Sequence, residues 1–202
     1  FFFSHAKTAN AKETYARIMH YFVLVVCLIT LSLVANIELL KYFIKGNADQ
    51  QALYWSGLKI VPVLLFAYVF LGVYMNLSVW YKLSDQTSMG LYITLTGFVI
   101  TVIGNLYWIP RVGILGAAWT TLSSYVAMAL LSIFLGQYHF PVPYNFGRLA
   151  LYVLSAALLG WVAAFFSMTT VWPSILCAAL MLGIVCFAER ALLFKRFKRL
   201  EP

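Results

Sequence analysis

Forty consecutive residues, Leu149 to Ala188, contain no Asp, Glu, Lys or Arg. A soluble domain carries about 25% charged residues, so a run this long would leave a soluble surface without polar cover. Two membrane-spanning helices need roughly 20 apolar residues each, which together match the run. Met168–Ser174 is the predicted break between them, because Pro173 suits the first turn of a helix. We therefore expect two membrane spans here.

Four further apolar stretches have the length of a span. They are Tyr21–Ile44, Ile60–Tyr81, Gly90–Ile109 and Gly113–Gly136. Strands are not expected, because the runs are long and show no alternation of polar and apolar residues. With 63% hydrophobic and 10% charged residues, the sequence predicts an all-α, polytopic transmembrane helix bundle with six spans over residues 21–188. Residues 1–20 are expected to be the end of a preceding helix and a cytoplasmic connecting segment, and residues 189–202 a basic cytoplasmic tail.

The basic residues predict the orientation of the spans. Six spans would place one set of ten on the same side as both chain ends: Lys7, Lys12, Arg17, Lys82, Arg148, Arg190, Lys195, Arg196, Lys198 and Arg199. Only Lys41, Lys45, Lys59 and Arg111 would lie opposite. The positive-inside rule then puts both ends of the segment in the cytoplasm. Because these charges are scattered between apolar runs, the net charge of +8 does not indicate nucleic-acid binding.

Small residues predict where helices pack closely. In the third span they recur every three or four residues, and the fourth span repeats the pattern. The positions are Gly90, Thr94, Gly97, Thr101 and Gly104, then Gly113, Gly116, Thr120, Ser124 and Ala127. Close approach over small residues and hydrogen bonds between hydroxyls hold helices together in lipid. We expect helix–helix contacts here.

No motif in the sequence indicates catalysis. The acidic residues are few and dispersed, and neither a phosphate-binding glycine loop nor a metal-ligand spacing is present. The sequence therefore predicts no enzyme, no cofactor and no metal. Glu38 is the one carboxylate inside an expected span, three residues before Lys41. It suits either a local ion pair or a role in ion coupling.

The second span carries the most informative polar residues. Tyr68, Gly72, Asn76 and Trp80 recur every four residues, which predicts a polar and aromatic stripe. Asn76 needs hydrogen-bond partners, and the stripe could either hold helices together or line a cavity. Lys82 follows at the membrane boundary, where it could anchor the helix or contact the phosphates of a lipid-linked substrate.

Several segments, in order along the chain, resemble one transporter family. They are Phe1–Lys7 (FFFSHAK), Tyr74–Thr87 (YMNLSVWYKLSDQT), Ile109–Thr121 (IPRVGILGAAWTT) and Gln137–Tyr144 (QYHFPVPY). The second is similar to the "NLSxWYKLxDxT" segment of Wzx-type polysaccharide and lipopolysaccharide flippases, and the third to their "IPxxGxxGAAWAT" turn. These flippases belong to the multidrug/oligosaccharidyl-lipid/polysaccharide exporter superfamily. Gln86 stands where a basic residue is frequent in the family, so a phosphate contact at that position is not expected.

The resemblance implies the C-terminal lobe of a two-lobed exporter with about 14 helices, whose N-terminal lobe is missing here. Such a protein moves a polyprenyl-pyrophosphate-linked oligosaccharide from the cytoplasmic to the periplasmic leaflet of the bacterial inner membrane. Asn76, Lys82 and Asp85 lie in the matching motif and, with Tyr68 of the stripe, are candidates for contacting the substrate or lining its cavity. Glu38, from its place in an expected span, is the candidate for ion coupling. The expected partners are the lipid-linked oligosaccharide, membrane lipids and the missing lobe.

Other functions remain open at this point. A drug or small-solute antiporter of the same superfamily would need carboxylates in its cavity, and only Glu38 is available. A membrane-embedded transferase would need a cluster of His, Asp or Glu in a loop, whereas Asp49, Asp85 and His139 occur singly. In a purely structural subunit, the stripe at Tyr68 would serve only packing.

Overall fold

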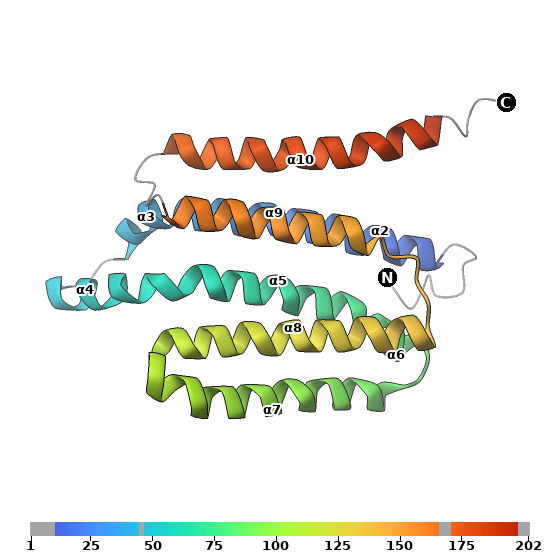
Figure 1. Ribbon diagram of the computed structural model, residues 1–202, viewed down its shortest axis with the longest axis horizontal. Coiled ribbons are helices and arrows are strands. Elements are labelled where there is room, and N and C mark those ends of the chain that lie inside the picture. The colour runs from blue at the N-terminus through green and yellow to red at the C-terminus, as the bar shows by residue number, and fades with distance from the viewer. Residues whose placement is uncertain (1–10, 45–46, 166–170, 198–202) are drawn as a thin grey trace. The chain divides into compact units, whose positions relative to one another are not determined.

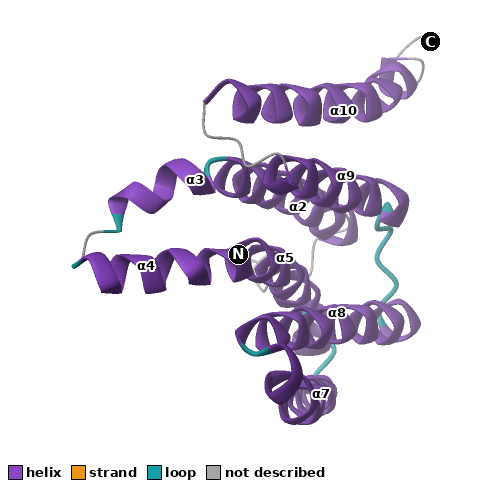
Figure 2. Cartoon of the chain, turned by 60° about the vertical axis from the view of Figure 1, so that its left-hand side comes forward, coloured by secondary structure: helices purple, strands orange, loops and turns teal. Residues whose placement is uncertain are grey.

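The computed structural model describes residues 11–44, 47–165 and 171–197, and every regular element in these ranges is a helix (Figures 1 and 2). The α-helices are α2 (Ala11–Ala35), α3 (Ile37–Leu40), α4 (Ala48–Gly57), α5 (Val61–Leu77), α6 (Val79–Leu83), α7 (Thr87–Val112), α8 (Ile114–His139), α9 (Phe146–Phe165) and α10 (Val171–Phe197). Two short 3₁₀ helices, η1 (Lys41–Phe43) and η2 (Leu58–Ile60), lie between them. The predicted all-α fold is confirmed.

Five helical stretches are long and apolar enough to cross a bilayer. They are Ala11–Ala35, Asp49–Leu83, Thr87–Val112, Ile114–His139 and Phe146–Ala164, and a shorter apolar stretch, Ile175–Phe187, lies within α10. These lengths and compositions are those of a multi-pass membrane protein. Pro173 falls in the first turn of α10, as predicted, while residues 168–170 of the expected break lie outside the described residues.

The first span differs from its prediction. It was expected at Tyr21–Ile44, but α2 begins at Ala11 and ends at Ala35. Asn36 ends the helix, because its side-chain amide donates to the Ser32 carbonyl at 2.8 Å and its backbone leaves the α region. Residues 11–20, expected in a connecting segment, are therefore helical, and residues 1–10 lie outside the described part.

The chain divides into two compact units, Phe1–Val23 with Ile44–Asn145 and Leu24–Phe43 with Phe146–Pro202. In the first unit, α8 packs against both α5 and α7 (Figure 1). In the second unit, α9 packs against α10. The Ser155 hydroxyl of α9 lies 3.3 Å from the sulfur of Met181 on α10, which is fully buried.

Small residues hold α7 against α8. The Ser124 hydroxyl donates to the Gly97 carbonyl of the facing helix at 2.8 Å, and Thr101 lies 3.1 Å from the same hydroxyl. Any side chain at Gly97 would collide with Met128, and one at Gly104 would collide with Thr120. The contact predicted for these two small-residue stripes is confirmed.

A single residue, Gly113, connects α7 to α8. Its backbone has φ 66° and ψ −143°, a region that residues with a Cβ rarely enter. Three residues further on, Gly116 faces the carbonyl oxygen of Trp108, which would lie 2.7 Å from an added Cβ. The hairpin therefore depends on glycine twice, for its turn and for the approach of its two helices.

The hairpin generates a stability prediction. Replacing Gly116 with Ala would force a methyl group against the Trp108 backbone, and we expect the variant to lose about 1–3 kcal/mol of unfolding free energy. Gly183 in α10 is the matched control, since an added Cβ meets nothing within 4 Å there. Gly183→Ala is expected to be neutral or stabilising by up to about 1 kcal/mol. Equal stability of the two variants in detergent unfolding would refute the close approach at Gly116.

Candidate functional site on helices α5, α6 and α8

The helix is interrupted at Ser78, between the end of α5 at Leu77 and the start of α6 at Val79. The Ser78 hydroxyl donates to the Met75 carbonyl at 2.7 Å, and it accepts a hydrogen bond from the Lys82 ammonium at 3.1 Å. A serine hydroxyl that bonds to the preceding turn can bend a helix. Because Ser78 is itself buried, this break belongs to the packed part of the first unit.

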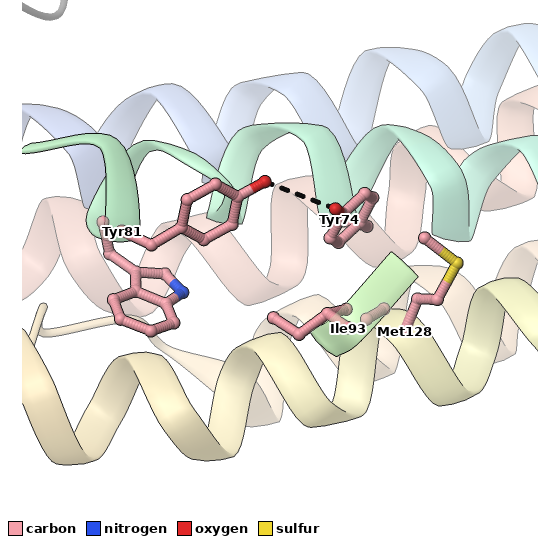
Figure 3. Packing of buried hydrophobic residues seen from close by; sticks show 6 residues of the cluster. Tyr74, Tyr81, Ile93 and Met128 are labelled. Carbon is pink, nitrogen blue, oxygen red and sulfur yellow. Dashed lines mark hydrogen bonds between the residues drawn. The ribbon is translucent and has the colours of Figure 1, made fainter. Parts of the chain in front are cut away.

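A chain of hydroxyl groups ties the broken helix to α7, and Figure 3 shows its first link, between Tyr74 and Tyr81. The Tyr74 hydroxyl lies 3.3 Å from the Tyr81 hydroxyl and 3.3 Å from the Thr94 hydroxyl. Thr94 uses its proton on the Gly90 carbonyl at 2.8 Å, so Tyr74 donates to Thr94 and accepts from Tyr81. Tyr74 and Tyr81 are buried, and Figure 3 shows them beside Ile93.

Trp80 ties the same region to α8. Its indole nitrogen donates to the Ser132 hydroxyl at 3.2 Å, and both residues are buried. Its ring stacks on His139 with centroids 5.7 Å apart, and it lies against Gly136. Trp80 is therefore a structural residue in this fold, since all its polar capacity is used inside the bundle.

A different set of side chains points away from the bundle. Tyr68 and Met75 on α5 are each 57% exposed, and Lys82 on α6 is exposed as well. These residues are seven apart, which returns to nearly the same side of a helix after two turns. Tyr125 of α8 lies beside the first of them, with ring centroids 6.2 Å apart. We call Tyr68, Met75, Lys82 and the neighbouring Tyr125 the Tyr68 face.

The depth of Tyr68 in the membrane makes its exposure informative. Lys59 and Lys82 are separated by about 35 Å of helix, so they bracket a hydrocarbon layer of about 30 Å. Tyr68 lies about 14 Å along the helix from Lys59, near the middle of that layer. Tyr125 is similarly near the middle of α8.

Both tyrosine hydroxyls of the Tyr68 face lack a hydrogen-bond partner in the described part of the chain. Those of Tyr68 and Tyr125 form no hydrogen bond with any residue that the structure describes. In hydrocarbon, an unpaired hydroxyl costs roughly 2–7 kcal/mol, depending on the reference state. A polar environment on this face would remove that cost.

The predicted stripe does not form one face. Gly72 packs against Phe22 of α2, and Asn76 is half-buried, with its amide donating to the Gly72 carbonyl of its own helix at 3.3 Å. Trp80 is buried against α8. Four residues advance a helix by 400°, so each step from Tyr68 turns by about 40° and the stripe rotates from the exposed side into the core.

The two charged candidates near the break are both exposed. Lys82 lies within hydrogen-bonding distance of Ser78, and its ammonium is 6.0 Å from the centroid of the Tyr81 ring. Asp85 lies in the turn before α7 with φ 53°, a left-handed conformation that Asp tolerates. The substrate contacts assigned to Lys82 and Asp85 remain predictions.

Glu38 is not part of this site. It belongs to the second unit and lies in α3, beyond the end of α2, rather than inside the first long helix. Its carboxylate forms the expected ion pair with Lys41, and this hydrogen bond raises the pKa of the Lys41 ammonium. The ion-coupling role of Glu38 stays a prediction, without the intramembrane position that suggested it.

Sequence reasoning missed Tyr125. It lies on α8 next to Ser124, which faces α7, so the small-residue pattern drew attention to the other side of the helix. The available signal was an aromatic residue with a hydroxyl near the centre of a charge-free span. The same criterion identifies Tyr68.

Two tyrosines of α5 form a matched pair for a stability test. Tyr74→Phe removes the hydrogen bonds to Tyr81 and Thr94, and we expect a loss of about 1–2 kcal/mol of unfolding free energy. Tyr68→Phe removes a hydroxyl that no described residue binds and should leave stability unchanged. Unfolding both variants in the same detergent checks this, and a larger loss for Tyr68→Phe would show that its hydroxyl has a structural partner.

Comparisons with known proteins identify no relative of this chain. No protein-family model, no curated protein and no solved structure matches it. What the chain does therefore has to follow from the chemistry of its own residues and from the motif resemblance.

Proposed function

We propose that this chain is part of a flippase that moves a polyprenyl-pyrophosphate-linked oligosaccharide across the bacterial inner membrane. The motif resemblance suggests the family, and the exposed, unpartnered Tyr68 hydroxyl at mid-membrane depth is the observation that carries the proposal. A lipid-facing helix has no use for such a group. A helix that lines the path of a polar solute does.

The chemistry of the Tyr68 face suits a sugar. Tyr68 and Tyr125 offer hydroxyls that can both donate and accept. Sugar hydroxyls need partners of this kind to leave water. The helix α5 carries no charged residue, so the path along it would recognise neutral hydroxyl groups. Cationic contacts within the membrane would come from the N-terminal lobe that the resemblance implies.

Lys82 would act at the end of the path. Its ammonium is exposed where the apolar helix ends, which is the level of lipid phosphates. With both ends of the segment in the cytoplasm, Lys82 would meet the pyrophosphate on the side where the substrate is loaded. Its hydrogen bond to the neutral Ser78 leaves its charge available.

An antiporter of the same superfamily is the second candidate, and it lacks a favourable observation. It would need a carboxylate in the bilayer, but among the described residues α5 and α8 contain none and Glu38 lies beyond α2. A membrane-embedded transferase would need acidic or histidine residues clustered in a loop. The ion pair of Glu38 with Lys41 suits a structural role at the helix end better than the ion coupling of an antiporter.

Surface polysaccharide measures this function directly. In cells that carry only the variant protein, Tyr68→Phe and Lys82→Ala should each lower surface polysaccharide, by roughly three- to tenfold if one hydrogen bond to the substrate is lost. Lys59→Ala is the control, since Lys59 is exposed in η2 at the other end of α5. Membrane levels of all variants are measured in parallel. Wild-type surface polysaccharide in both test variants, with wild-type amounts of the protein in the membrane, would refute the proposal.

A further inference from the structure

One end of the first unit brings exposed basic side chains together from two helices. Lys12 and Arg17 lie in the first two turns of α2, and Lys82 lies near the end of α6. Leu83 of α6 packs against the buried cluster that contains Ala11. Lys12 follows Ala11 in the chain and Lys82 precedes Leu83. Because Ala11 and Leu83 belong to the same packed region, the two cations lie at the same end of the unit.

The ammonium groups of Lys12 and Lys82 contact uncharged side chains. The Lys12 ammonium lies 4.6 Å from the centroid of the Phe140 ring, and Lys82 donates to the Ser78 hydroxyl at 3.1 Å. Phe140 packs against the clusters of both α2 and α6, so it forms an apolar floor at this end. In the described part of the chain, none of Lys12, Arg17 and Lys82 forms an ion pair.

Two carboxylates lie near these cations in sequence. Glu13 follows Lys12 directly and lies four residues before Arg17, on the same side of α2 as Arg17. Asp85 lies in the turn after α6. Both are exposed, and neither forms an ion pair with a residue that the structure describes.

We propose that Lys12, Arg17 and Lys82 bind the headgroup phosphate of an anionic glycerophospholipid in the surrounding leaflet. The cations lie where apolar helices end, so they stand at headgroup level while the exposed apolar surface beside them receives the acyl chains. Basic side chains gathered at such a boundary bind anionic headgroups. In the absence of substrate, the bound lipid would hold the start of α2 against α6, and it would leave Lys82 when the pyrophosphate of the proposed substrate binds there.

The test compares lipids on the purified full-length protein in a zwitterionic detergent, with no polyprenyl substrate present. Short-chain phosphatidylglycerol and phosphatidylcholine with the same acyl chains are titrated, and binding is followed by native mass spectrometry. We expect preference for phosphatidylglycerol, weakened about fivefold for each cation removed and about 25-fold in Lys12→Gln/Lys82→Gln. Lys59→Gln, which removes an exposed cation from the other end of α5, should bind like the wild type.

Each other outcome overturns the proposal. Equal binding of the two lipids would show that the headgroup charge is not recognised. If Lys59→Gln lost as much affinity for phosphatidylglycerol as Lys12→Gln or Lys82→Gln, the preference would depend on the net charge of the protein rather than on this site. Inorganic phosphate is titrated separately, and displacement of the lipid at equal concentration would assign the site to a free anion. Circular dichroism of each variant establishes that its helices are intact. Export is not measured here, so a failed transport assay and a failed lipid assay are distinguishable.

Discussion

The absence of water in the hydrocarbon layer is the constraint on which this structure depends. Each polar group there needs a partner within the protein, and the helices supply backbone partners by themselves. Side-chain hydroxyls follow the same rule, since Thr96, Thr120, Thr121 and Ser123 each donate to the carbonyl four residues before. Hydroxyls on Ser124 and Thr101 go further and link two helices. Because these hydroxyls are satisfied, the unpaired Tyr68 hydroxyl supports the proposal that its surface meets something other than lipid.

The all-helical fold followed from the sequence because a charge-free run of span length permits few structures. Of the six expected spans, five appear as helices of span length, and the sixth contains the shorter apolar stretch Ile175–Phe187. Boundaries were less predictable where charge and helix end do not coincide. The expected first span treated Lys12 and Arg17 as lying outside the helix, yet α2 includes them. A helix can carry charges in its first turns at headgroup level, so a count of apolar residues places its start too late. Its end is set by Asn36, whose side-chain amide donates to the Ser32 carbonyl, and a hydropathy pattern does not predict this local hydrogen bond.

The candidate site was predictable in residue type but not in direction. Polar residues in the second span indicated a functional helix, and Tyr68 does lie on an exposed surface. The spacing of four, however, could not show which members would turn inward. Trp80 became a packing residue because Ser132 on α8 accepts its indole proton, a contact between positions 52 residues apart in sequence. Such pairings depend on how α5, α6 and α8 meet, which no single-helix pattern contains.

The two sides of α5–α6 differ in how their polar side chains are paired. Inward, Tyr74, Trp80 and Tyr81 use their polar atoms on neighbouring helices, which fixes the position of the break at Ser78. Outward, the Tyr68 hydroxyl has no partner among the described residues, on a helix that this network already holds in place. A rigid support lowers the entropy lost when a side chain binds a solute. If the proposed recognition of the substrate by Tyr68 and Lys82 is correct, the buried network is the support that holds these two side chains in position.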